Sequence, residues 1–178
     1  MIWFTGDEHF DHREIIRYCN RPFKSKDEMN NVIIKRFNEV VNVNDTVWHI
    51  GDFSMYGAER AHFFRSMMKK YKEGVNHHLV LGNHDEASAF FYVKIGFTTV
   101  HTAMPMELAG IKFVLAHDPA VYCAIDKNTV LLCGHIHTLF KTLPENRVIN
   151  VGVDAWNFYP INLEQILAEV NKWGSIKS

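Results

Sequence analysis

Short apolar runs recur along the 178-residue chain, and each is followed by a small polar cluster. Five of these runs have the length of strands and are rich in Val, Ile, Leu, Phe and Trp, at residues 2–5, 46–50, 78–81, 111–116 and 129–133. A continuous apolar run bounded by turn residues is typical of a buried strand. The pattern therefore predicts buried strands whose carboxyl ends carry polar side chains.

Helical periodicity separates the early runs. Apolar residues recur at helical spacing in four segments, at residues 28–41, 58–71, 87–93 and 163–173. Alternating strands and helices predict parallel strands joined by right-handed crossovers. The first half of the chain is therefore expected to form a parallel sheet covered by helices.

The second half has a different pattern. Its apolar runs follow one another with short connections, at residues 97–100, 104–108, 111–115, 130–133, 148–153 and 160–163. Ala109-Gly110 favours a tight hairpin turn between two of them. We expect a second, more antiparallel sheet, packed face to face against the first with helices outside.

Length and composition favour one globular domain covering residues 1–178, since hydrophobic residues make up 47% of the chain. The net charge is −1, which argues against binding long nucleic acid through charge alone. No apolar window approaches the roughly 18 residues of a membrane helix, and the start lacks the features of a secretory signal. Cys19, Cys123 and Cys133 have no close pairing, which is typical of reduced thiols. A cytoplasmic location without membrane association is expected.

The polar clusters after the strands contain most of the groups that indicate chemistry. In an open α/β sheet, ligands bind just beyond the carboxyl ends of the strands. The clusters offer eight such side chains, Asp7, His9, Asp52, Asn83, His84, His117, His135 and His137. Seven of the eight are good ligands for two divalent cations, because carboxylate and imidazole suit Mn, Fe, Zn or Ni. Two dications about 3.5–4 Å apart need an anion between them, and one bridging carboxylate supplies it.

The order of these clusters resembles that of the calcineurin-like metallophosphoesterases. The matching motifs are Asp7-Glu8-His9, Gly51-Asp52, Gly82-Asn83-His84-Asp85, a lone His117 and Gly134-His135-Ile136-His137. The resemblance covers nearly the whole chain and implies a four-layer αββα sandwich of two mixed sheets. It implies two metal sites that share Asp52, one completed by Asp7, His9 and His137 and the other by Asn83, His117 and His135. In this pattern His84 faces the substrate.

One departure from the family bears on the substrate. The phosphoprotein phosphatases of this superfamily have Gly-Asp-x-x-Asp-Arg-Gly, whose Arg binds the phosphoryl group, but residues 51–57 here contain no Arg. The chain looks closer to small bacterial and phage phosphoesterases and to the phosphodiesterase branch. We predict a metal-dependent phosphoesterase that favours phosphodiesters and acts on a small phosphate ester or nucleotide. The alternatives are a phosphomonoesterase, a nucleotide pyrophosphatase and a non-catalytic scaffold of the same fold.

The ligand sets predict which groups carry out the attack on phosphorus and the protonation of the leaving oxygen. Two divalent ions, with Mn favoured, are expected to lower the pKa of a bridging water, so that hydroxide attacks phosphorus. His84 is expected to protonate the leaving oxygen, with Asp85 as its orienting partner. His12 and Arg21 follow the first motif and are candidates for substrate contact, with a helix-surface role as the alternative. His49 lies within a strand and is expected to pack in the core or to support the site from behind.

Overall fold

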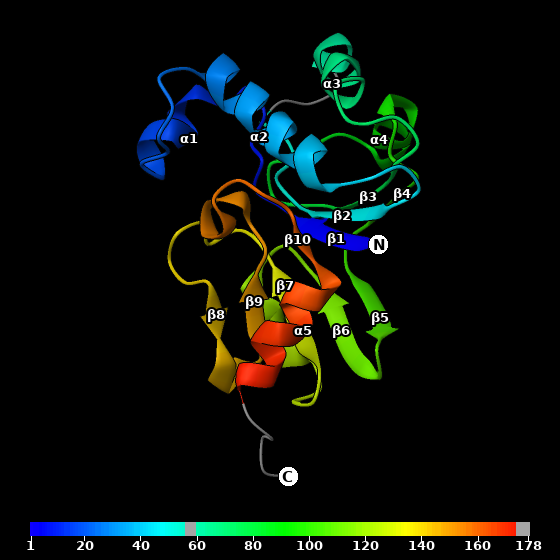
Figure 1. Cartoon of the computed structure of the whole chain (residues 1–178), viewed down its shortest axis with the longest axis vertical. Helices are drawn as coiled ribbons and strands as arrows, with labels where there is room; N and C mark the ends of the chain where they lie inside the picture. Colours follow the sequence, from blue (N-terminus) through cyan, green and yellow to red (C-terminus); the bar gives the residue numbers. More distant parts are fainter. Residues whose placement is uncertain (56–59, 174–178) are drawn as a thin grey trace.

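Two mixed sheets form the centre of the fold in the computed structural model, which describes residues 1–55 and 60–173 (Figure 1). The first sheet has the strand order β10-β1-β2-β3-β4. Its members are β1 (Ile2–Thr5), β2 (Thr46–Ile50), β3 (Asn76–Val80), β4 (Thr99–His101) and β10 (Ile161–Asn162). Strands β1 to β4 are parallel to one another, so their carboxyl ends meet at one edge of the sheet.

The second sheet has the strand order β5-β6-β7-β9-β8. Its members are β5 (Met104–Leu108), β6 (Ile111–Leu115), β7 (Val130–Cys133), β8 (Thr142–Leu143) and β9 (Val148–Asn150). Ala109 and Gly110 have φ of 51° and 74°, as the predicted tight hairpin turn between β5 and β6 requires. Antiparallel pairing is confined to the two outer pairs, because β6, β7 and β9 are parallel.

Two runs expected in the second sheet belong to the first. Strand β4 pairs in parallel with β3, and β10 pairs antiparallel with β1. Apolar periodicity identifies a strand but carries no information about its neighbour, which explains the misplacement. The C-terminal run therefore returns to the first sheet beside the N-terminal strand.

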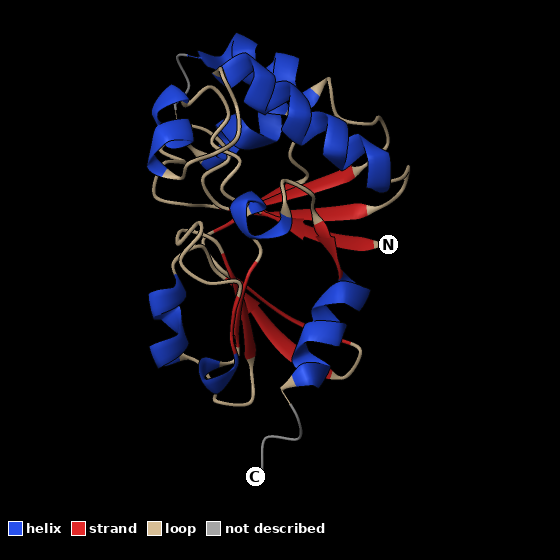
Figure 2. Cartoon of the chain, turned by 60° about the vertical axis from the view of Figure 1, so that its left-hand side comes forward, coloured by secondary structure: helices blue, strands red, loops and turns tan. Residues whose placement is uncertain are grey.

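Helices α1 (Arg13–Tyr18), α2 (Lys26–Val40), α3 (Ala61–Met68) and α4 (Ala89–Ile95) lie over the outer face of the first sheet (Figure 2). Helix α2 begins after Ser25, whose hydroxyl accepts a hydrogen bond from the Glu28 amide. Residues 58 and 59 of the predicted second helix lie outside the described residues. Helix α1 was not expected, because its six residues give too short a periodic signal.

Apolar clusters hold these layers together. One cluster joins the helices to the first sheet through residues such as Phe37, Phe64 and Leu79. A second lies between the sheets and includes Phe4 and Leu132, together with Ile166 of α5 (Leu163–Lys172). A third covers the outer face of the second sheet with side chains of the short 3-10 helix η2 (Pro119–Ala124).

The predicted sandwich of two mixed sheets between helical layers is confirmed. Helix α5 packs against the apolar cluster between the sheets, so the short helix η2 forms the fourth layer. Within the described ranges, no helix is both long and apolar enough to cross a membrane.

Candidate metal centre

The predicted ligands come together where the strands end. Asp7 follows β1, Asp52 follows β2 and Asn83 follows β3, while His117 follows β6 and two histidines follow β7. The predicted Asp and His ligands form two groups, in each of which the ligand atoms lie within 4.8 Å of one another: Asp7, His9 and His137, and Asp52, His117 and His135. The division matches the two sets that the family resemblance implies.

The backbone at these positions is strained. Five of the seven predicted ligands have positive φ, with values of 55° at Asp7, 51° at His9, 53° at Asp52, 73° at His135 and 46° at His137. Residues other than glycine rarely adopt this left-handed conformation, which costs about 1–3 kcal/mol each and concentrates at functional sites. Gly51 shares it, with φ of 78°, and a Cβ there would lie 2.2 Å from the His117 ring. The strained backbone conformation thus directs these side chains toward one another.

Acceptor atoms converge in the second group. His117 Nδ1 lies 3.0 Å from the Ile50 carbonyl oxygen, so this nitrogen carries the proton and donates it there. The lone pair of His117 Nε2 then faces Asn83 Oδ1 at 3.1 Å, Asp52 Oδ2 at 3.3 Å and His135 Nδ1 at 3.3 Å. With neutral imidazoles these four atoms share at most one proton, on His135 Nδ1, so acceptors are in excess and a cation satisfies the arrangement.

The first group contains buried atoms without partners. Asp7 Oδ2 and His9 Nε2 are buried and have no hydrogen-bond partner. His9 Nε2 also lies 3.5 Å from Asp52 Oδ2, which places Asp52 between the two groups. An unpaired buried polar atom costs about 1–3 kcal/mol, and a bound cation removes that cost. The residues present therefore fit two divalent cations with Asp52 shared between them.

The electrostatics agree with this fit. Burial raises the pKa of Asp52, but hydrogen bonding and the charge of His117 lower it to about 2 overall. Burial lowers the pKa of His117, but Asp52 and Asp7 together raise it to about 9. The carboxylates thus make this pocket attractive to positive charge. A metal ion competes with the His117 proton, because ligation needs the neutral imidazole.

A cavity of about 660 Å³ opens beside the first group. His9, His12, His84 and His137 line it on the side of the metal ligands. The His84 side chain is 34% exposed, and its Nε2 lies 4.0 Å from Asp52 Oδ2. His12 Nδ1 lies 3.4 Å from His9 Nδ1. His84, the expected acid, and His12, one of the two candidates for substrate contact, therefore border the cavity.

Comparison with known proteins identifies the family. Residues 2–160 match the model of the calcineurin-like phosphoesterase superfamily domain. The chain belongs to that superfamily. It is 32% identical to an uncharacterised protein of Methanocaldococcus jannaschii, over 96% of this chain and 92% of that protein. It is 26% identical to the Gene 66 protein of Mycobacterium phage D29, over 88% of this chain and 89% of that protein.

Among solved structures, the chain is similar to a protein of unknown function from Aquifex aeolicus, with a TM-score of 0.73. The sequence identity is 23%, and the match covers 95% of this chain and 98% of the other. This likeness shows a shared fold. The substrate therefore has to be inferred from the residues of the site in this chain.

Asp154 is a site residue that the sequence prediction missed. It lies in the 3-10 helix η4 (Val153–Trp156), and its Oδ2 is 2.9 Å from His137 Nδ1. A carboxylate bonded to one ring nitrogen fixes the tautomer and leaves the other nitrogen free for a metal. The available signal was an Asp close behind a strand and a glycine, the same context as Asp7 and Asp52.

The expected substrate contact of Arg21 is not found. Its side chain is fully buried, and Nε and Nη2 bond both oxygens of Asp154 at 2.8 and 2.7 Å. Its remaining N–H groups meet the backbone carbonyls of Asp7 and Glu8 and the sulfur of Met29. With its donors engaged in this way, Arg21 positions Asp154 and the loop that carries Asp7 rather than facing the cavity.

Asp85 also differs from its expected role. Its carboxylate accepts hydrogen bonds from the backbone amides of Asp52 at 2.8 Å, Phe53 at 3.1 Å and Gly82 at 2.8 Å. Burial raises its pKa to about 7. Its contacts therefore fix the loop that presents Asp52 instead of orienting the neighbouring His84.

Proposed function

We propose that the protein is a metal-dependent phosphoesterase that hydrolyses small phosphate esters, including nucleotides, with a preference for phosphodiesters. The observation that carries this proposal is the convergence of Asn83 Oδ1 and Asp52 Oδ2 on His117 Nε2, at 3.1 and 3.3 Å, in a chain of the phosphoesterase superfamily. Such a cluster of lone pairs is stable when a cation occupies it.

The chain offers ligands for two dications. Asp7, His9 and His137 would hold one, and Asn83, His117 and His135 the other, with Asp52 shared. Carboxylate, imidazole and amide oxygen favour Mn, Fe, Zn or Ni, and we propose Mn as the working metal. When bound, two dications supply a water of lowered pKa and positive charge for the phosphoryl oxygens.

His84 is proposed to protonate the leaving oxygen. Its backbone amide donates to Asp52 Oδ1 at 2.9 Å, which anchors the residue beside the metal ligands. Its side chain borders the cavity, where the ester group would lie. An imidazole next to the reacting phosphate is a suitable proton donor near neutral pH.

The preference for diesters is supported by the charge of the cavity. Among its described lining residues there is no Lys or Arg. A monoester dianion gains most from an additional cation, whereas a diester monoanion needs less. The cavity therefore suits the singly charged phosphodiester.

Hydrolysis of bis(4-nitrophenyl) phosphate and 4-nitrophenyl phosphate by metal-depleted protein, with and without added Mn²⁺, tests this function. We expect turnover only with the metal, and a higher kcat/KM for the diester. Absence of turnover with Mn, Fe, Zn and Ni alike would contradict the phosphoesterase proposal. A higher kcat/KM for the monoester would overturn the diester preference alone.

A further inference from the structure

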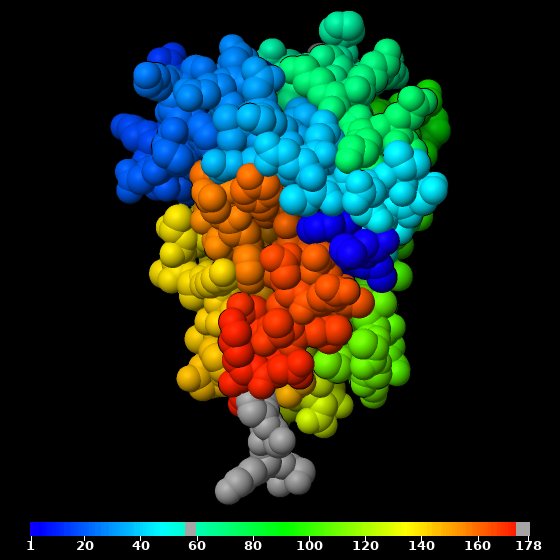
Figure 3. All heavy atoms as spheres, viewed as in Figure 1, coloured from blue at the N-terminus to red at the C-terminus, as the bar shows by residue number. Residues whose placement is uncertain are grey.

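One wall of the 660 Å³ cavity is not explained by metal binding or proton transfer. Helix α1 and the residue after it contribute Glu14, Ile15, Tyr18 and Cys19 to the lining. In the space-filling view, the α1 region lies directly above the loop that follows β7, shown in yellow (Figure 3). The metal ligands and α1 thus face a common space that is larger than a phosphoryl group needs.

Tyr18 is the most exposed aromatic group in this wall. Its residue is 62% exposed, and within the described chain its ring joins none of the three apolar clusters. The guanidinium of Arg17 lies 5.2 Å from the ring centroid, and the His12 ring approaches it nearly edge-on at 6.4 Å. These contacts hold a flat apolar surface at the cavity without burying it, although leaving an aromatic ring in water brings no folding benefit.

The charge that lines the cavity on this wall disfavours a second anionic group beside Glu14. Glu14 is the one formally charged residue among the α1 side chains that line the cavity, and its Oε2 lies 3.9 Å from His12 Nε2. A phosphate placed against Glu14 would meet this carboxylate, because the Arg17 guanidinium lies on the Tyr18 ring and is not among the described lining residues. An uncharged group that carries N–H donors would instead find an acceptor in Glu14.

We propose that the α1 wall binds an uncharged, flat aromatic group of the phosphate ester, such as a nucleobase, by stacking on Tyr18. The same wall disfavours esters that carry a further phosphate on the moiety to which that aromatic group is attached. This inference rests on the proposed phosphoesterase function and narrows its substrate to aromatic phosphodiesters. It also disfavours pyrophosphates and polynucleotides, which place additional charge beside the reacting phosphate.

Two nitrophenyl esters with the same leaving group provide the test. Thymidine 5′-(4-nitrophenyl phosphate) carries an uncharged nucleoside, and its 3′-phosphorylated form adds only a further phosphate. Stacking on an aromatic side chain is typically worth a factor of about ten or more in binding. We expect Tyr18→Ala to raise the KM for the first ester about tenfold with little change in kcat, and Tyr18→Phe to retain most of the affinity.

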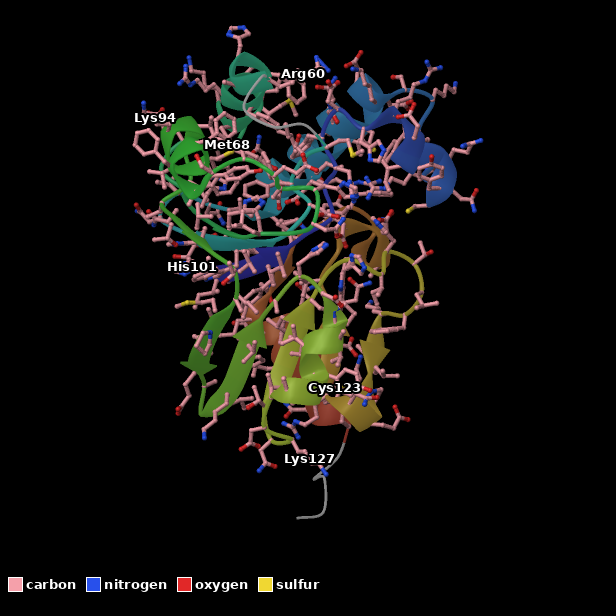
Figure 4. All side chains as sticks on the ribbon, turned by 180° about the vertical axis from the view of Figure 1, so that it is seen from behind. Arg60, Met68, Lys94, His101, Cys123 and Lys127 are labelled. Carbon is pink, nitrogen blue, oxygen red and sulfur yellow. The ribbon has the colours of Figure 1, made fainter. Side chains whose placement is uncertain are left out.

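The matched control is Tyr122→Ala, which removes another exposed tyrosine from η2. Its neighbour Cys123 lies at the opposite end of the molecule from α1 (Figure 4). We expect the wild type to prefer the ester without the 3′-phosphate by about tenfold in kcat/KM, and Glu14→Gln to narrow this ratio. The Tyr122 variant should match the wild type.

The outcomes separate this inference from the proposed function. An unchanged KM in Tyr18→Ala, or equal use of the 3′-phosphorylated ester by the wild type, would overturn the α1 subsite while hydrolysis persists. A KM raised as much in Tyr18→Phe as in Tyr18→Ala, with Tyr122→Ala unchanged, would show that the hydroxyl, not the ring, binds the ester, and would overturn stacking. No turnover of either ester by the wild type with Mn²⁺ would contradict the phosphoesterase function itself.

Discussion

Two clusters of histidines differ in how their atoms pair. His117 and His135 turn lone pairs toward Asn83 and Asp52 at the strand ends. His49 and His77 lie inside the first sheet, where His49 Nδ1 is 2.6 Å from Glu8 Oε1 and His49 Nε2 is 3.0 Å from His77 Nδ1. Both clusters are rich in imidazole, but only at the strand ends do the acceptor atoms outnumber the protons that neutral side chains supply.

Burial explains the pairing of donors and acceptors in the inner cluster, which consists of Glu8, His49 and His77. Desolvation raises the pKa of Glu8 to about 8 and lowers those of His49 and His77 to about 3 and about 2. At neutral pH the protonated Glu8 donates to His49, and His49 donates to His77, so each contact has one donor and one acceptor. The rings also stack on Phe37. A histidine count therefore does not identify a metal centre; the balance of donors and acceptors does.

Asp52→Asn should have the largest effect on metal binding and turnover, because it removes the one negative charge shared by the two ligand groups. We expect kcat on bis(4-nitrophenyl) phosphate to fall by about 10³-fold or more and the content of both metals to fall. Asp126→Asn, on the exposed surface, serves as the control. Full metal content and turnover in Asp52→Asn would show that the carboxylate is dispensable.

His84→Ala should keep both metals and the fold, because its side chain is not among the ligand groups. General acids typically contribute about 10²–10⁴-fold, and we expect a loss in that range for an alkyl or nucleoside leaving group. A nitrophenolate needs little protonation, so nitrophenyl esters should be relatively spared. The matched variant His117→Ala should lower metal content and slow both leaving groups alike. Equal slowing of both by His84→Ala would rule out an acid role.

Asp154→Asn tests the contact that fixes the His137 ring. Loss of such a carboxylate typically weakens metal binding about 10–100-fold, and we expect that loss at one of two ions, measured by equilibrium dialysis. Arg21→Gln keeps Asp154 but removes its other partner. If Arg21→Gln weakens metal binding equally, the effect of Asp154 comes from the buried ion pair and not from orienting His137.

The smallest expected effect concerns the inner cluster. The folded state keeps His49 and His77 neutral, whereas the unfolded chain protonates them below pH about 6.5, so their contribution to stability falls as pH falls through that value, while the raised pKa of Glu8 contributes in the opposite direction. Between pH 7 and pH 5 each histidine should cost about 2 kcal/mol of unfolding free energy. In urea unfolding of metal-depleted protein, His77→Asn should lose about 2 kcal/mol less than the wild type between pH 7 and pH 5, and exposed His62→Asn should match the wild type. An identical pH dependence in wild type and His77→Asn would contradict neutral burial.

Much of this site could be read from the sequence because its ligands follow strands. Apolar runs locate β1, β2, β3, β6 and β7, and parallel pairing within each sheet brings the residues behind them together. Helical spacing likewise located α2, whose predicted range of 28–41 overlaps Lys26–Val40. These features depend on local periodicity, which a single sequence carries.

The remaining features depend on contacts between distant residues. Arg21 and Asp154 are 133 positions apart, and nothing in the local pattern of either reveals that the pair is buried. Asp85 was assigned to its neighbour His84, but the loop turns its carboxylate back toward the amides of Asp52 and Phe53. Sheet membership of β4 and β10 likewise depends on tertiary pairing that periodicity does not encode.

The central claim is that converging lone pairs at the strand ends form a site for two cations that share Asp52. Metal-depleted protein should be dialysed against a series of Mn²⁺ concentrations and its bound metal determined by elemental analysis. The account predicts saturation at two ions per chain in the wild type, with His77→Asn unchanged and His117→Ala reduced. Saturation of the wild type at one ion, or no saturable binding, would contradict it.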